Sequence, residues 1–166
     1  VATDATMTET TTEAGTYSGS YAVTDVVADG SYDVTVTIGA GSDSKTEAVV
    51  IDKTAPTIAS ATSDPDSLRN GESLTLKVTT EAGATVTANV SALDTTQTDA
   101  VAVAESTTTA GTYSAAVTIS SDTTAESGAK VVVVTATDLA GNASTKDVTV
   151  SLTTFSAFDL AIPKGI

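Results

Sequence analysis

The sequence lacks three residue types on which much protein chemistry depends: cysteine, histidine and tryptophan. Without cysteine, no disulfide framework can form, although a secreted chain would permit one. Without histidine, the commonest general base is missing, and zinc, haem and iron–sulfur sites built from cysteine and histidine are excluded. The sequence also has no glycine-rich phosphate loop and no G-x-S-x-G elbow. These absences predict that the chain is not an enzyme and requires no cofactor.

Basic residues and long apolar runs are also scarce. The 7 Lys and Arg residues stand against 21 Asp and Glu residues, which gives a formal net charge of −14. Such a surface repels nucleic acid and anionic membranes, and it favours solubility and divalent cations. No segment approaches the roughly 20 apolar residues that span a bilayer, and the first residues do not resemble a signal peptide. We therefore expect no nucleic-acid partner and no membrane insertion in this segment.

The residues that are abundant favour β-strands. Thr makes up about a fifth of the chain, far above ordinary usage, and Ala and Val supply most of the apolar residues. Small and β-branched side chains pack well on pleated sheets, whereas the strong helix formers are few. In residues 73–80, Leu74, Leu76 and Val78 alternate with polar residues. This period of two predicts a strand with one buried face.

Six further segments show a similar pattern, and the turn-rich residues 64–72 are predicted to connect the first two strands. The seven predicted strands cover residues 57–62, 73–80, 84–90, 99–105, 112–119, 130–137 and 144–152. Seven short strands in about 100 residues are typical of an immunoglobulin-like β-sandwich. The predicted fold class is therefore all-β, with antiparallel strands in two facing sheets.

The chain also repeats itself. The segment EAGTYS at residues 13–18 recurs as TAGTYS at residues 109–114, and residues 8–52 match residues 105–153. Only the second copy has a front half, residues 57–90. The pattern predicts tandem Ig-like repeats with an incomplete first repeat. A half-sandwich exposes its core face, so either a repeat array is cut within a domain or strands from another chain complete it.

The repeat divides the chain into three predicted parts. Residues 1–55 are the C-terminal half of an Ig-like repeat, or a domain completed by another chain. Residues 56–153 form a complete sandwich, reached through a short joint that Pro56 makes semi-rigid. Residues 154–166 begin a further domain or form a docking strand. The tail residues expected to take part in assembly are Phe155, Phe158, Leu160 and Ile162.

Two short segments carry a family resemblance. The segment DKTAP at residues 52–56 opens a domain, and the segment TDLAGN at residues 137–142 precedes its last strand. Together they resemble the tandem Ig-like repeats of prokaryotic surface proteins, including large adhesins and S-layer proteins. The resemblance implies a secreted or cell-surface location, with copies of the chain or neighbouring Ig-like repeats as partners. In the first copy the corresponding turn, residues 39–43, lacks the Asp–Asn pair.

One end of the predicted sandwich collects oxygen ligands. The start of the domain, the loop between the second and third strands and the last hairpin turn meet there. They carry Asp52, Glu81, Asp138 and Asn142. Carboxylate and carbonyl oxygens are the ligands that Ca²⁺ prefers, and the resemblance implies that Ca²⁺ stiffens joints in such arrays. Alternatively, Asp138 and Asn142 only shape their turn, because Asx side chains bond to their own backbone.

Two segments fit the rule for N-linked glycosylation. Asn89 opens the triplet NVS, and Asn142 opens the triplet NAS. Asn89 is expected to point outward from its strand, together with Thr87. Asn142 is expected on an exposed turn. Both are candidate sites in a host that has the modifying enzymes.

These features predict a structural extracellular protein: a subunit or segment of a surface layer, sheath or filament. The alternative is the stalk of a surface adhesin, which holds a distal binding domain away from the cell. A carbohydrate-binding module is a third class. The absence of Trp argues against it, because sugars usually stack on aromatic side chains.

Overall fold

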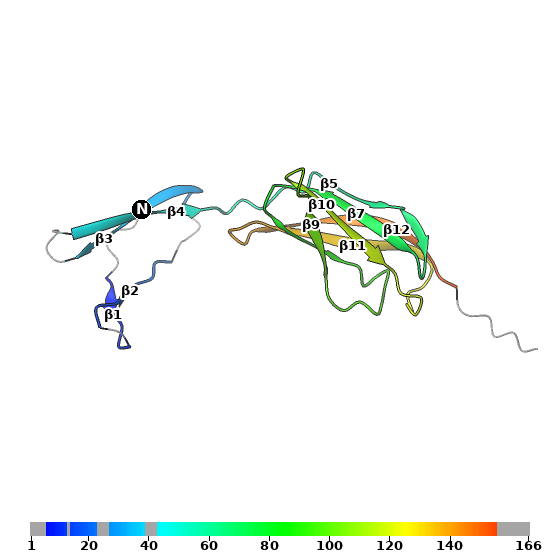
Figure 1. Ribbon diagram of the computed structural model, residues 1–166, viewed down its shortest axis with the longest axis horizontal. Helices are drawn as coiled ribbons and strands as arrows, with labels where there is room; N and C mark the ends of the chain where they lie inside the picture. The colour runs from blue at the N-terminus through cyan, green and yellow to red at the C-terminus, as the bar shows by residue number, and fades with distance from the viewer. Residues whose placement is uncertain (1–5, 13, 23–26, 39–42, 156–166) are drawn as a thin grey trace, which may run out of the picture. The chain divides into compact units, whose positions relative to one another are not determined.

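β-Strands are the regular elements of the computed structural model in the part of the chain that it describes (Figure 1). That part consists of residues 6–12, 14–22, 27–38 and 43–155. The chain divides into two compact units, Val1–Lys53 and Thr54–Ile166, named unit 1 and unit 2 below. Within the described ranges, no helix is long and apolar enough to cross a membrane. The prediction of an all-β fold is confirmed, whereas the predicted domain limits and the tandem repeat stay predictions.

Unit 2 contains eight strands joined by hydrogen bonds into one continuous sheet. In chain order they are β5 (Ser60–Asp64), β6 (Ser67–Arg69), β7 (Ser73–Thr79), β8 (Thr85–Asn89), β9 (Val101–Glu105), β10 (Thr112–Thr118), β11 (Gly128–Thr137) and β12 (Ala143–Thr153). Their order across the sheet is β5-β7-β10-β9-β8-β11-β12-β6. All neighbours are antiparallel except β12 and β6, which run parallel.

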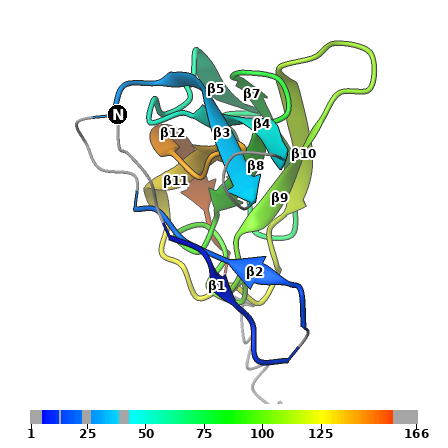
Figure 2. The same ribbon diagram turned by 90° about the vertical axis from the view of Figure 1, so that its left-hand side faces the viewer.

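This strand order is that of an Ig-like sandwich. In such a sandwich, strands A, B, E and D form one layer and strands C, F and G form the other. The segment β5-β7-β10-β9 corresponds to the first layer, and β8-β11-β12 corresponds to the second. Figure 2 views the unit along its length, with β9 and β10 on one side and β11 and β12 on the other. Because β9 pairs with both β10 and β8, the sheet rolls from one layer into the next and is nearly barrel-like.

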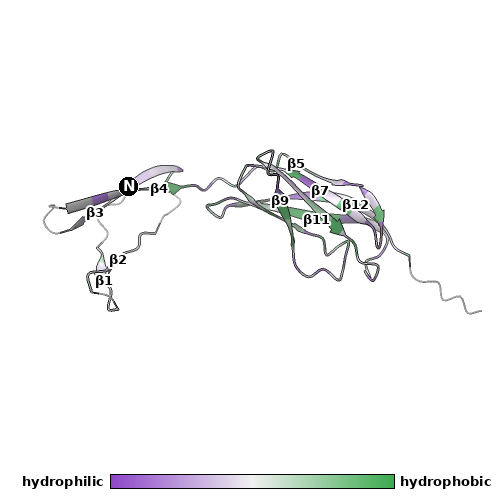
Figure 3. Ribbon diagram, in the orientation of Figure 1, coloured by the Kyte–Doolittle hydropathy of each residue, from purple (hydrophilic) through white to green (hydrophobic). Residues whose placement is uncertain are grey.

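The buried residues of the core occupy every second position along the strands, as the sequence pattern predicted. Along β7, Leu74, Leu76 and Val78 are buried while their neighbours face outward, and Figure 3 shows hydrophobic and hydrophilic residues along the strands. Val132 and Val134 of β11 are buried in the same core cluster. These side chains contribute most of the hydrophobic stabilisation, about 1.5–3 kcal/mol for each fully buried Val or Leu.

The first segment of unit 2 fastens the two layers together. β5 pairs with β7 in one layer, and β6 pairs with β12 in the other. The Lys146 Nζ atom on β12 donates hydrogen bonds to the carbonyl oxygens of Ile58 (3.2 Å) and Ala59 (2.9 Å). Lys146 therefore satisfies backbone groups of the segment that leads into β5.

Two sequence predictions for unit 2 need correction. Residues 64–72 were expected to be a turn-rich connection, but Ser67–Arg69 form β6. The strands were expected to be antiparallel in two facing sheets. β6 and β12 are instead parallel, and β9 joins the two layers into one sheet by pairing with both β10 and β8. The sequence pattern missed β6 for a local reason. β6 has a single buried apolar residue, Leu68, and its pairing partner lies far away along the chain, so local periodicity carries almost no signal for it.

Unit 1 contains two hairpins. Its strands are β1 (Thr8–Glu9), β2 (Tyr17–Ser18), β3 (Gly30–Ile38) and β4 (Asp43–Ile51). β1 pairs with β2 and β3 pairs with β4, each in an antiparallel two-stranded sheet. In the described residues of unit 1, no strand pairing joins one hairpin to the other. The described residues of unit 1 form hairpins without a buried core like that of unit 2. Several of their large apolar side chains are exposed: Tyr17, Tyr21, Val34, Val36, Val49 and Val50.

Candidate functional sites

The turn between β11 and β12 contains two of the residues predicted to bind calcium. The Asp138 Oδ1 atom accepts a hydrogen bond from the backbone N–H of Asn142, and Oδ2 accepts one from Asn142 Nδ2, each at 2.8 Å. The Asn142 side-chain bond is the main reason that the pKa of Asp138 is lowered. Both carboxylate oxygens are thus engaged within the turn, as expected if Asp138 and Asn142 shape it.

The other two predicted calcium ligands lie on other elements: Asp52 follows β4, and Glu81 lies between β7 and β8. Asp52 belongs to unit 1. The backbone carbonyl of Glu81 accepts a hydrogen bond from the Tyr113 hydroxyl (2.8 Å). Over the residues that the structure describes, no three Asp or Glu side chains form a group that could hold a metal ion. The structure therefore brings together Asp138 and Asn142 of the four predicted ligands.

Calcium binding stays a prediction, and it has a direct test. Adding Ca²⁺ to the metal-free protein should raise the melting temperature of unit 2, because a ligand that binds only the folded state stabilises it. The variant Asp138→Asn should lose this rise, because it removes the charge that Ca²⁺ requires. Thermal unfolding followed by circular dichroism measures both. A melting temperature that does not respond to Ca²⁺ in the wild-type protein would end the calcium interpretation.

The two predicted glycosylation sites differ in their surroundings. Asn89 is exposed at the end of β8, and its Oδ1 accepts a hydrogen bond from the backbone N–H of Ser91 (3.0 Å). The Asn142 amide nitrogen, the atom to which a glycan would attach, donates to Asp138. A glycan on Asn142 would compete with that bond, whereas Asn89 presents its amide on an outward-facing position. Both sites stay predictions.

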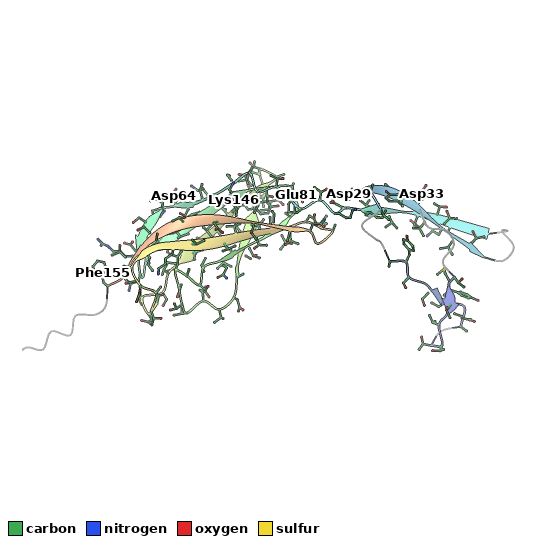
Figure 4. All side chains as sticks on the ribbon, turned by 180° about the vertical axis from the view of Figure 1, so that it is seen from behind. Asp29, Asp33, Asp64, Glu81, Lys146 and Phe155 are labelled. Carbon is green, nitrogen blue, oxygen red and sulfur yellow. The ribbon has the colours of Figure 1, made fainter. Side chains whose placement is uncertain are left out.

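The chain is held where it leaves β12. The Asn70 Nδ2 atom donates to the carbonyl of Phe155 (3.3 Å), and Asn70 Oδ1 accepts from the Phe155 N–H (3.1 Å). The Arg69 guanidinium carbon lies 5.3 Å from the centre of the exposed Phe155 ring, within the range of a cation–π contact (Figure 4). The other predicted assembly residues lie outside the described residues: Phe158, Leu160 and Ile162. Sequence reasoning missed Asn70 because its partner is 85 residues away.

A hollow lies at the same end of unit 2. Its volume is about 450 Å³, and its lining residues are Asn70, Ser121, Asp122, Thr123, Thr124, Ala125, Glu126, Thr154 and Phe155. The lining is rich in hydroxyl groups. The Oγ1 atoms of Thr123 and Thr124 bond to Thr95 and so already serve to hold the loops together. The hollow is therefore a junction of loops around the point where the chain leaves the sandwich.

A glutamate fixes the turn between β9 and β10. Glu105 Oε1 accepts a hydrogen bond from the Gly111 N–H (2.7 Å), and Oε2 accepts one from the Gly83 N–H (3.2 Å). The bond from Gly111 is the main cause of the lowered pKa of Glu105. Gly111 has a φ of +76°, and a Cβ atom there would lie only 2.6 Å from the Thr80 carbonyl oxygen. The turn thus packs directly against the loop between β7 and β8.

The same turn occurs in unit 1, between β1 and β2. Glu9 Oε1 accepts a hydrogen bond from the Gly15 N–H at 2.7 Å, the distance found for Glu105 and Gly111. Glu9 stands opposite Tyr17 in the hairpin, just as Glu105 stands opposite Tyr113. The two tyrosines nevertheless differ in burial, because Tyr113 is 1% exposed and Tyr17 is 53% exposed.

The second hairpin of unit 1 also has a counterpart in unit 2. In β3–β4, Gly30 pairs with Ile51 and Val36 with Lys45. In β11–β12, Gly128 pairs with Leu152 and Val134 with Lys146. The two hairpins therefore have the same register: in each, a Val–Lys pair lies six residues after the paired glycine on the first strand. Valines on the corresponding face are buried in unit 2 and exposed in unit 1.

Comparisons with known proteins identify a structural neighbour but no family. No protein family and no curated protein matches the chain. Among solved structures, the chain is similar to the BIgI domain of the β protein from S. agalactiae, solved bound to CEACAM1. That domain is 17% identical in sequence, with a TM-score of 0.35, and the match covers 60% of this chain and 100% of the domain.

Proposed function

We propose that the chain is a structural, non-enzymatic segment of an extracellular surface layer, sheath or filament built from tandem Ig-like repeats. The observation that carries this proposal is the end-to-end path of the chain through unit 2. The chain enters beside one end of β12, where Ser144 Oγ donates to the Pro56 carbonyl (2.6 Å). It leaves two residues beyond the other end, at Phe155.

The length of β12 separates these two points. The strand has 11 residues, so at about 3.3 Å per residue it spans roughly 35 Å. Hydrogen bonds hold both points: Lys146 and Ser144 fasten the incoming segment, and Asn70 fastens the outgoing one. A module with its attachment points fixed at opposite ends adds its length to an array and transmits a pull through its strands. This favours a load-bearing or spacing role.

Self-assembly tests the proposal against its alternative, an adhesin stalk. Electron microscopy and analytical ultracentrifugation of the purified chain over a range of concentrations measure assembly. A subunit of a layer or filament should form ordered sheets or fibres above a threshold concentration. A stalk segment has the same end-to-end path but stays monomeric, so a chain that remains monomeric throughout would favour the stalk.

A further inference from the structure

The hairpin β3–β4 has two faces of different character. The inner face carries Val34, Val36 and Val49, because paired residues in an antiparallel hairpin point to the same side. The opposite face is mainly polar, and there the Thr35 and Thr46 hydroxyls hydrogen-bond to each other (2.8 Å). The three inner-face valines are nevertheless exposed, Val49 by 45%. Lys45 and Glu47 share this face with the valines. A two-stranded hairpin with exposed valines is marginal alone and is normally covered by another layer.

Unit 2 shows what covers the corresponding face. Lys146 donates to the backbone carbonyls of Ile58 and Ala59, which belong to the segment leading into β5 (Figure 4). Lys45 has the register position of Lys146, because each stands opposite the last of the inner-face valines. In unit 1, the Lys45 side chain is 81% exposed and pairs with the exposed carboxylate of Glu47 at 2.7 Å. Lys45 is thus placed to receive the carbonyls of an incoming segment.

The hairpin β1–β2 gives an independent indication of the same kind. In unit 2, the Tyr113 hydroxyl donates to the Glu81 carbonyl, and Gly111 leaves room for the Thr80 carbonyl. Both partners lie in the loop between β7 and β8. In unit 1, Tyr17 is exposed, and a Cβ atom on Gly15 would meet no atom within 4 Å. The hairpin thus has the features that dock on this loop in unit 2, but no described residue of unit 1 fills the space beside Gly15.

All of these partners in unit 2 come from one continuous segment, the front half, residues 57–90. Its strands β7 and β8 also pair with β10 and β11, and so connect the two hairpins. Among the described strands, hairpins of this kind occur in both units, whereas one front half is seen, and unit 2 uses it itself. A second copy of the same chain could therefore cover these hairpins only by giving up its own front half. Its unit 2 would then lose the strands that complete it.

We propose that the inner face of the hairpin β3–β4, together with the hairpin β1–β2, binds a polypeptide segment with the strand pattern of residues 57–90. Alternating small apolar side chains cover Val34, Val36 and Val49. Backbone carbonyls of the segment accept hydrogen bonds from Lys45 and from the Tyr17 hydroxyl. This inference does not depend on surface assembly, since it concerns binding to a single copy of the chain.

The occupant must also accommodate Glu47. This residue stands opposite Val34, whereas the corresponding residue of β12, opposite Val132, is the buried Val148. A carboxylate covered by another layer needs a charged or hydrogen-bonding partner, because burying it unpaired is costly. Because Lys45 turns to the carbonyls of the bound segment, the natural occupant carries a hydrogen-bond donor or a basic side chain that pairs with Glu47.

The front half of this chain itself serves as the probe. A dye-labelled peptide of residues 54–100 is added to the full 166-residue chain, and binding is followed by fluorescence anisotropy. Amide hydrogen exchange in β3 and β4 reports where it binds. We expect saturable binding of one peptide per chain and slower exchange in both strands. The variant Glu47→Val, which imitates Val148, should bind more tightly than the wild-type chain.

Two adjacent residues of β4 provide a matched control. Val49→Asp places a charge on the inner face and should weaken binding at least about tenfold. Val50→Asp makes the same substitution on the opposite face and should leave binding unchanged. Hydrogen exchange of the variants without peptide verifies that the hairpin persists, and Lys45→Met, which adds no charge, should also weaken binding.

Three results would overturn the proposal. The first is no binding to either the wild-type chain or Glu47→Val. The second is equal binding by the Val49→Asp and Val50→Asp variants, which would place the peptide elsewhere. The third is self-association of the chain that is abolished by Val49→Asp but not inhibited by the peptide. This result would make a second copy of the chain the occupant. Ordered assembly can fail while the peptide still binds, so this result and that for the proposed function are separable.

Discussion

Replacing Tyr113 with alanine is expected to lower the free energy of unfolding of unit 2 by about 3–5 kcal/mol, the range for removing a large buried aromatic side chain. Tyr113 is the largest of the fully buried side chains. It lies on β10, opposite Val78 on one neighbouring strand and Glu105 on the other. The truncation therefore leaves a cavity in the core where two strand pairs meet, and the surrounding strands can fill it only in part.

The hydroxyl group makes a smaller contribution that a second variant isolates. Tyr113→Phe keeps the ring but removes the hydrogen bond to the Glu81 carbonyl, so we expect a loss of about 1 kcal/mol. Urea unfolding followed by circular dichroism measures both variants, because the chain has no Trp for fluorescence. Tyr17→Ala is the matched control and should change stability by less than about 0.5 kcal/mol, since Tyr17 is exposed. Equal losses for Tyr17→Ala and Tyr113→Ala would contradict the burial seen here.

The sequence was sufficient to predict the strands whose side chains alternate. Leu74, Leu76 and Val78 occupy every second position, and this alone places them on one face of a strand. The outward position of Asn89 follows from the same rule. These features are local, so the order of residues along the chain contains them. The repeated EAGTYS and TAGTYS segments matched residues 8–52 with residues 105–153. In the structure, each segment contains a glycine with positive φ whose N–H bonds to a glutamate six residues earlier.

Features that depend on distant partners could not be read from the pattern. Pairing of β9 with both β10 and β8, which rolls the sheet, depends on how three strands twist together. The hydrogen bonds between Asn70 and Phe155 join residues that are 85 positions apart in the sequence. For the calcium site, the sequence predicted that several loops meet at one end of the sandwich, and this stays a prediction. The sequence did not indicate that Asp138 directs both oxygens at Asn142.

Asp94 is the clearest case of a role invisible in the sequence. It lies in the connection between β8 and β9 and is 2% exposed, which is rare for a carboxylate. Oδ2 accepts a hydrogen bond from the Ser120 N–H (2.8 Å), and Oδ1 accepts from the Thr96 N–H (3.0 Å) and Oγ1 (2.7 Å). Asp94 therefore holds its own loop and ties it to the end of β10, 26 residues further along the chain.

The hydrogen bonds of Asp94 also set its response to pH. Burial alone raises the pKa of this carboxyl, but the bonds from the Thr96 hydroxyl and from the Ser120 and Thr96 N–H groups outweigh burial. The net result is a pKa below the ordinary value. A carboxyl group with a lowered pKa stabilises the fold fully above its unfolded-state pKa of about 3.9. That contribution is lost as the pH falls through the lower pKa of the folded state.

Replacing Asp94 with alanine is therefore expected to lower the free energy of unfolding at pH 7 by about 2–4 kcal/mol, because buried N–H donors lose a charged acceptor. Asp94→Asn should retain part of the stability, since its one carbonyl oxygen can still accept. Urea unfolding at several pH values measures both effects. Between pH 7 and about pH 5 the deficit of Asp94→Asn should be constant. Below about pH 4 it should shrink, because the unfolded wild-type chain takes up a proton at Asp94 before the folded protein does, and the contribution of the charge is lost. A deficit that stays the same down to pH 2 would show that Asp94 acts through its shape alone and not through its charge.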